Sequence, residues 1–96
     1  MIEVDLAADS ELALQECLRR GLVIRSEREL AGRAGSRHYH LAYPGRPGTL
    51  ELSELDGRSW FAVNERRDCG WVSDFARDVA RAIDSSAAEA ASSSEG

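Results

Sequence analysis

The chain has 96 residues, 43% of them hydrophobic and 30% charged, with a formal net charge of −5 at pH 7. A chain of this length forms one small domain, which buries only about 60 to 65% of the surface that its unfolded form exposes. The composition is typical of a globular protein and excludes the collagenous, membrane-embedded and largely disordered classes. Composition therefore bounds the fold class but indicates no function.

Charge is distributed unevenly along the sequence. All 12 basic residues are arginine, which is typical of a GC-rich, bacterial genome. Residues 1–18 hold five acids and no base, residues 19–67 hold ten bases and six acids, and residues 68–96 hold six acids and two bases. The acidic ends can neutralise the basic middle, which argues against strong non-specific binding of nucleic acid.

Neither the N-terminus nor the cysteines indicate export. The first residues lack the basic and apolar regions of a secretory signal, and no long apolar run follows, so we expect a cytoplasmic protein without a membrane segment. Cys17 and Cys69 form no CxxC pair. We expect reduced thiols, with a disulfide between the two as the alternative, and no cofactor.

Helical patterns occur near both ends of the chain. Asp9 offers an N-cap oxygen and Gly21 a C-terminal stop, which predicts a helix from Asp9 to Arg20. A stronger apolar stripe predicts a second helix from Trp71 to Asp84; its members are Val72, Phe75, Ala76, Val79, Ala82 and Ile83. The remaining residues, 85–96, contain no apolar residue larger than alanine, and we expect a disordered tail there beyond a single domain of residues 1–84.

Period-two alternation between the helices predicts strands. Asp56-Gly57 is typical of a type I′ hairpin turn and would pair Leu55 with Arg58 and Leu52 with Phe61. A four-residue loop at 45–48 would pair Tyr43 with Leu50 and Leu41 with Leu52. A weaker edge strand, Leu22 to Leu30, would pair Leu30 with Tyr39.

These elements predict an α+β fold: a four-stranded antiparallel β-meander with an N-terminal and a C-terminal helix packed on one face. Ile2, Val4 and Leu6 alternate with acids and can add a short strand at the N-terminus. The opposite face would carry a cross-strand row of Glu29, His40, Ser53 and Trp60.

Catalytic and metal-binding interpretations of that row are weak. Glu29, His40 and Ser53 suggest acyl transfer, but a flat sheet supplies neither an oxyanion hole nor a water-excluding cleft, so we expect no enzyme; a His40-dependent enzyme is the least favoured alternative. His38 and His40, at i and i+2, could chelate a metal with Glu29, Glu51 or Cys69. Structural zinc sites usually have four ligands at short spacing, so we expect surface histidines and no metal.

Nucleic-acid binding is the second hypothesis. Arginines lie among aromatic residues in the middle of the chain, and the candidate phosphate contacts are Arg33, Arg37, Arg46, Arg66 and Arg67. Leu18-Arg19-Arg20-Gly21-Leu22-Val23-Ile24 followed by Ser36-Arg37-His38-Tyr39-His40-Leu41 resembles the helix end and wing hairpin of winged-helix regulators. Such regulators need two further helices before the wing, and the 20 residues upstream hold one.

The leading hypothesis is a non-enzymatic interaction domain of the regulator, inhibitor/immunity or adaptor type, which docks through its open sheet face or its exposed edge strand. Tryptophan and arginine are enriched in binding hot spots, and Trp60 is expected outside the helix-covered core. The expected contact surface for a protein partner or a second copy comprises Trp60, His38, His40, Arg58, Leu55 and Glu51. The alternative is that the N-terminal segment, or a loop, folds over Trp60 and buries it within the same molecule.

Overall fold

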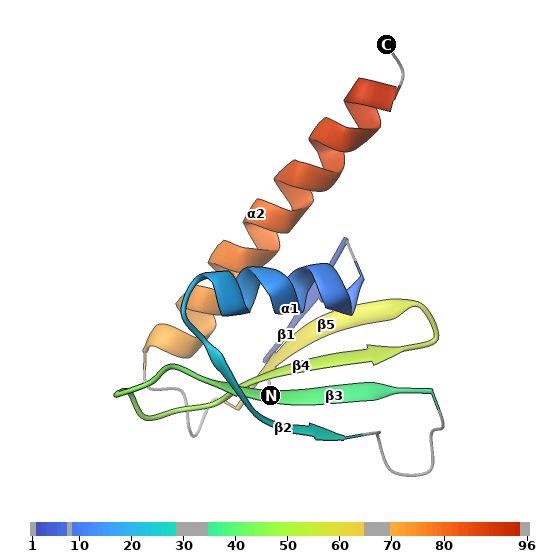
Figure 1. Ribbon diagram of the computed structural model, residues 1–96. Helices are drawn as coiled ribbons and strands as arrows, with labels where there is room; N and C mark the ends of the chain where they lie inside the picture. The colour runs from blue at the N-terminus through green and yellow to red at the C-terminus, as the bar shows by residue number, and fades with distance from the viewer. Residues whose placement is uncertain (1, 8, 29–34, 65–69, 95–96) are drawn as a thin grey trace.

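The computed structural model describes residues 2–7, 9–28, 35–64 and 70–94, and the side chains of the last helix as far as residue 85. Five strands form one antiparallel sheet in the order β1-β5-β4-β3-β2. The strands are β1 (Ile2–Leu6), β2 (Val23–Arg28), β3 (Arg37–Ala42), β4 (Leu50–Leu55) and β5 (Arg58–Val63). The helices are α1 (Ser10–Arg19) and α2 (Trp71–Ser94) (Figure 1).

The predicted α+β architecture is confirmed, with one strand more than the expected four. The N-terminal segment does not fold over Trp60 but lies beside β5 as an edge strand, and it pairs Val4 with Phe61 and Asp5 with Trp60. Its alternation of apolar residues and acids suits this position, because the apolar side chains share the face of Phe61 while the acids share that of Trp60.

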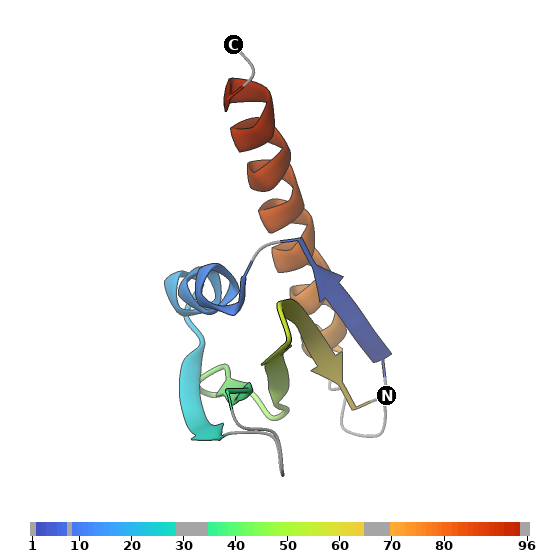
Figure 2. The same cartoon turned by 90° about the vertical axis from the view of Figure 1, so that its right-hand side faces the viewer.

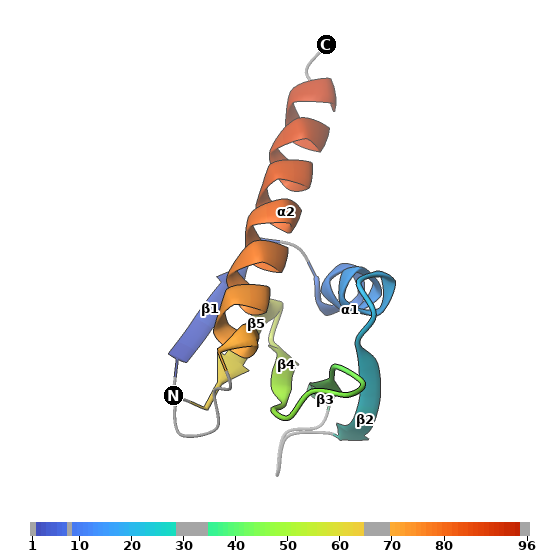
Figure 3. The ribbon, with the colours of Figure 1, turned by 90° about the vertical axis from the view of Figure 1, so that its left-hand side faces the viewer.

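Both helices contribute to a single core over one face of the sheet. Their buried side chains join those of the strands in one cluster: Ala13, Cys17, Leu22, Tyr39, Leu41, Leu50, Leu52, Phe61, Val63, Val72, Ala76, Val79 and Ile83. Figures 2 and 3 show the sheet curving, with β2 rising towards α1. The predicted placement of both helices on one face is confirmed.

The ends of α1 follow the predicted signals. The Asp9 side chain accepts a 3.0 Å hydrogen bond from the backbone N–H of Leu12. At the other end Gly21 has φ 104°, and the N–H of Leu22 donates to the carbonyl of Cys17. These bonds satisfy backbone groups that a helix end would otherwise leave without partners.

Helix α2 continues to Ser94, ten residues beyond the predicted end at Asp84. Alanine has the highest helix propensity, and it recurs through the segment that the sequence predicts as a disordered tail. The last turns project beyond the sheet and α1 (Figure 1). None of the helices described is long and apolar enough to cross a membrane.

The Asp56-Gly57 turn has the predicted geometry. Asp56 and Gly57 have φ 52° and 79°, the positive values that a type I′ turn requires at both central positions. Leu55 pairs with Arg58 and Leu52 with Phe61, as predicted. Phe61 is fully buried, so the expected inner and outer faces of the hairpin are confirmed.

Two other predicted registers are wrong. Leu41 pairs with Leu50 and Tyr39 with Leu52, two residues from the expected β3–β4 register, because a turn from Tyr43 to Arg46 starts the loop earlier. A shift of two preserves the faces. Tyr39 pairs with Glu27 and not with Leu30.

Strand β2 lies at the edge of the sheet, as predicted. It spans Val23–Arg28, and its pairing with β3 shifts between Ile24 and Ser26. Residues 29–34, which include Glu29 and Leu30, lie outside the described residues.

Candidate functional site

The face of the sheet opposite the helices, hereafter the open face, carries the candidate site. Alternation on β3, β4 and β5 places six expected contact residues there, and the structure brings them onto adjacent strands: His38, His40, Glu51, Leu55, Arg58 and Trp60. None of these side chains belongs to the core cluster.

Trp60 and Arg58 form the first cluster on this face. The Arg58 guanidinium lies 4.5 Å from the centre of the Trp60 ring, within the range of a cation–π interaction. Arg58 Nη2 donates to Asp5 Oδ1 at 2.7 Å and to Glu3 Oε1 at 3.2 Å. These carboxylates, Asp5 before Glu3, raise the pKa of Arg58 and hold its guanidinium beside the indole.

His38, His40 and Glu51 form the second cluster. Glu51 Oε1 lies 3.1 Å from His38 Nε2 and 3.2 Å from His40 Nε2. The two Nε2 atoms are 3.1 Å apart, and the ring planes meet at 78°. The side chains are 18%, 36% and 22% exposed for His38, His40 and Glu51, so the cluster is only partly open to solvent.

The expected row of Glu29, His40, Ser53 and Trp60 is not formed as predicted. Ser53 pairs with His38, whereas His40 pairs with Glu51, as a consequence of the changed β3–β4 register. On β2 the residue opposite His40 is Ser26. Ser53 does pair with Trp60 across β4 and β5, as predicted.

A hydrogen bond of 2.7 Å joins His38 Nδ1 to Ser53 Oγ, so a hydroxyl, an imidazole and a carboxylate are linked in series. Such a series can activate a serine only if its oxygen can reach a substrate. Ser53 is 2% exposed in the middle of a sheet. Its position suits a group that orients His38, and not a nucleophile.

The arginines of the nucleic-acid hypothesis are not brought together among the described residues. Arg37 begins β3, and Arg46 lies in the loop after its far end, with its guanidinium 5.0 Å from the Tyr43 ring centre. Arg33, Arg66 and Arg67 lie outside the described residues, as does Cys69. The described chain ahead of β2 holds one helix, so no second helix is available there for a winged-helix arrangement.

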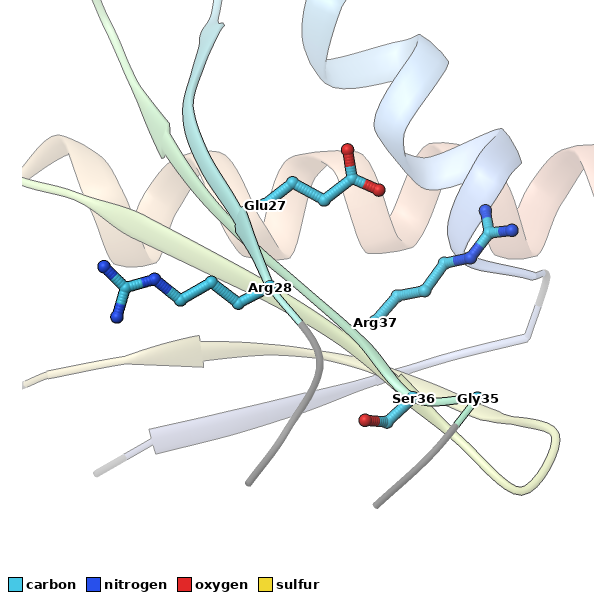
Figure 4. A pocket seen from close by; sticks show the side chains of 5 residues that line it. All are labelled: Glu27, Arg28, Gly35, Ser36 and Arg37. Carbon is cyan, nitrogen blue, oxygen red and sulfur yellow. The ribbon is translucent and has the colours of Figure 1, made fainter. Parts of the chain in front are cut away.

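A hollow of about 450 Å³ is lined by Glu27, Arg28, Gly35, Ser36 and Arg37. Figure 4 shows the Arg28 side chain pointing away from those of Glu27 and Arg37. This divergence follows from the strand alternation, which places neighbouring residues on opposite faces. The charged groups therefore do not converge on one ligand position.

Comparison with protein-family models finds no match. Comparisons with the curated proteins and with the solved structures find no match either. The interpretation of the open face therefore depends on its own residues and geometry.

Proposed function

We propose that this chain is a small non-enzymatic interaction domain that docks a protein partner, in the first instance a second copy of itself, through the open face. The observation that carries the proposal is the Arg58–Trp60 pair, in which an arginine held by two carboxylates lies over a tryptophan outside the core. A pre-positioned pair loses little conformational entropy when a partner covers it.

The charge pattern of the open face favours a second copy as the occupant. The β1 side carries exposed Glu3 and Asp5, and the β2 side carries exposed Arg28. In a two-fold symmetric dimer the same surface is used by both molecules. Two open faces packed in this way can oppose the acidic side of each copy to the basic side of the other.

The edge next to this face offers further apolar area. Val23 and Ile24 on β2 are 45% and 43% exposed, and among the described strands β2 has a neighbour only on its β3 side. Exposed apolar residues at a sheet edge can extend an interface that begins on the face.

The experiment is analytical ultracentrifugation of the wild-type chain, Trp60→Ala and Leu12→Ala over a range of concentrations and salt. We expect a concentration-dependent dimer for the wild type and for Leu12→Ala, whose deleted side chain is also exposed (55%) but lies on α1. We expect Trp60→Ala to remain monomeric and salt to weaken the dimer. A wild-type chain that is monomeric at every concentration overturns self-association through this face.

A further inference from the structure

Three atoms of types that bind metal ions meet on the open face. His38 Nε2, His40 Nε2 and Glu51 Oε1 are separated by 3.1, 3.1 and 3.2 Å. They come from two adjacent strands, because His38 and His40 are alternate residues of β3 and Glu51 pairs with His40 on β4. The triangle is nearly equilateral, so one ion can lie equally close to all three atoms.

The size of the triangle suits a first-row transition metal. With bonds of about 2.0 to 2.2 Å, neighbouring ligand atoms lie about 3.3 to 3.6 Å apart around a tetrahedral ion and about 2.8 to 3.1 Å apart around an octahedral one. The observed separations lie at the upper end of the octahedral range and just below the tetrahedral one. Shifts of a few tenths of an ångström would therefore suffice to bind an ion.

A buried neighbour orients one of the two imidazoles. Ser53 Oγ lies 2.7 Å from His38 Nδ1, and Ser53 is 2% exposed. When His38 Nδ1 is protonated, it donates a hydrogen bond to Ser53 Oγ, and Nε2 keeps the lone pair that a metal requires. Outer partners of this kind fix the tautomer and direction of metal-binding histidines.

The charge balance of the cluster also favours a cation. Glu51 is 22% exposed, and within the described part of the chain no arginine forms an ion pair with it. Its carboxylate contacts both imidazoles. A divalent ion would neutralise the carboxylate and accept lone pairs from both rings.

We propose that His38, His40 and Glu51 bind a divalent transition-metal ion, Zn²⁺ foremost, with Ser53 as a positioning residue. Imidazole nitrogens favour zinc and its neighbours in the series over Mg²⁺ and Ca²⁺, which bind oxygen ligands. Three protein ligands leave at least one coordination position for water or an external donor. The site is complete within one chain, so it does not depend on the proposed dimer.

The test is titration of the full-length chain with Zn²⁺ in competition with a chromophoric chelator. We expect one ion per chain, and a loss of affinity of at least about tenfold in His38→Ala, His40→Ala and Glu51→Gln. We expect a loss of about 10- to 100-fold in Ser53→Ala, since it removes an outer partner of the site. Circular dichroism checks that each variant folds, and His40→Gln replaces His40→Ala if the latter does not.

Matched controls separate this site from other zinc ligands. Glu54→Gln makes the same charge change on β4 but on the opposite face, and it should bind as the wild type does. Cys69→Ser should do the same. Co²⁺ gives a second measurement, because its visible absorption distinguishes tetrahedral from octahedral coordination and thiolate from nitrogen and oxygen ligands.

Three results would overturn the proposal. The first is the absence of Zn²⁺ binding by the wild type at millimolar concentration, and the second is unchanged affinity in a His38→Ala/His40→Ala double variant. The third is a loss of affinity in Cys69→Ser alone, which would assign the ion to the thiol. Trp60→Ala should bind Zn²⁺ normally, so failure of the dimer and failure of the metal site give different results.

Discussion

The two faces of the sheet are built from the same strands and differ in almost every property. Leu52 and Phe61 pair on the covered face, and both are fully buried beneath the helices. Their chain neighbours Ser53 and Trp60 pair on the open face, beside the histidines and Arg58. A single step along a strand therefore separates residues of the core beneath the helices from residues on the open face.

The largest expected effect comes from substituting neighbours on β5. Phe61→Ala should lower the free energy of unfolding by about 3 to 5 kcal/mol, because it leaves a cavity in the core. Trp60→Ala should lower it by about 1 to 2 kcal/mol, because the ring is only partly buried and loses its contact with Arg58. Urea denaturation measures both. Equal losses would contradict the assignment of the two faces.

If Phe61→Ala does not fold, Phe61→Leu keeps the comparison measurable. Leucine fills most of the space that the Phe61 ring occupies, so the free energy of unfolding should fall by about 1 to 2 kcal/mol. Zn²⁺ titration of Trp60→Ala and Phe61→Leu then shows whether the Zn²⁺ affinity of the open face depends on the packing of the core beneath it.

The next largest effect on stability is expected from substitutions in the Asp56-Gly57 turn, which determines which side chains lie on each face. Gly57 has φ 79°, and apart from Gly57 itself and its two chain neighbours no atom lies within 4 Å of the position that a Cβ would occupy. Gly57→Ala should therefore cost about 1 to 2 kcal/mol through backbone conformation alone. Gly57→Asn should cost less, because asparagine tolerates positive φ. If thermal denaturation shows that Gly57→Asn is less stable than Gly57→Ala, the positive φ is not the cause of the loss in stability.

A buried hydroxyl on the covered face is expected to lower stability, so its removal should raise the free energy of unfolding. Ser59 is buried, and among the described residues its Oγ has no hydrogen-bond partner. Ser59→Ala should raise the free energy of unfolding by about 1 kcal/mol, since it removes an unsatisfied hydroxyl. Ser53→Ala is the matched substitution on the open face and should destabilise the protein, because His38 loses its partner. A destabilised Ser59→Ala would mean that the hydroxyl is bonded in solution.

The smallest effect concerns the surface of α1. Hydrogen bonds from Arg19, and then from Arg20, lower the pKa of Glu16 from 4.5 to about 2. The folded state therefore gains stability above pH 4.5 that is lost as the pH falls towards 2. For a surface ion pair this gain is under about 1 kcal/mol.

Denaturation of the wild type and Glu16→Gln between pH 7 and pH 2 measures this contribution. The two stability curves should converge as the pH approaches 2. The double variant Arg19→Gln/Arg20→Gln should lose the same pH dependence, and a wild-type curve parallel to that of Glu16→Gln would exclude the pair as its source.

Local signals in the sequence predicted the hairpin and its faces. They also offered Glu51 as one of three possible partners of His38 and His40, but did not determine which of the three lies beside the imidazoles. The Asp56-Gly57 turn carries its own geometry, so the β4–β5 register follows from two residues. The β3–β4 register depends instead on a longer loop. The Pro47 carbonyl of this loop accepts a 2.7 Å hydrogen bond from the indole N–H of Trp71 in α2. That contact spans 24 residues, and alternation along the strands does not predict it.

The position of β1 in the sheet also depends on tertiary contacts that the local sequence does not predict. The alternation of Ile2, Val4 and Leu6 indicated a strand, but its partner depends on which edge of the sheet is within reach after α1 is docked. Only with β1 beside β5 do Glu3 and Asp5 reach Arg58. The arrangement of Arg58 over Trp60 is thus a tertiary consequence of an element that the sequence indicated only as an addition.

The irregularity in β2 between Ile24 and Ser26 limits how further chains can add to this protein. An extra residue tilts the outward amide and carbonyl groups out of even spacing, so an incoming strand can match only part of the rim. The same edge carries the charged residues Arg25, Glu27 and Arg28, which disfavour edge-to-edge strand pairing. Growth into fibres is thereby opposed at this end of the sheet.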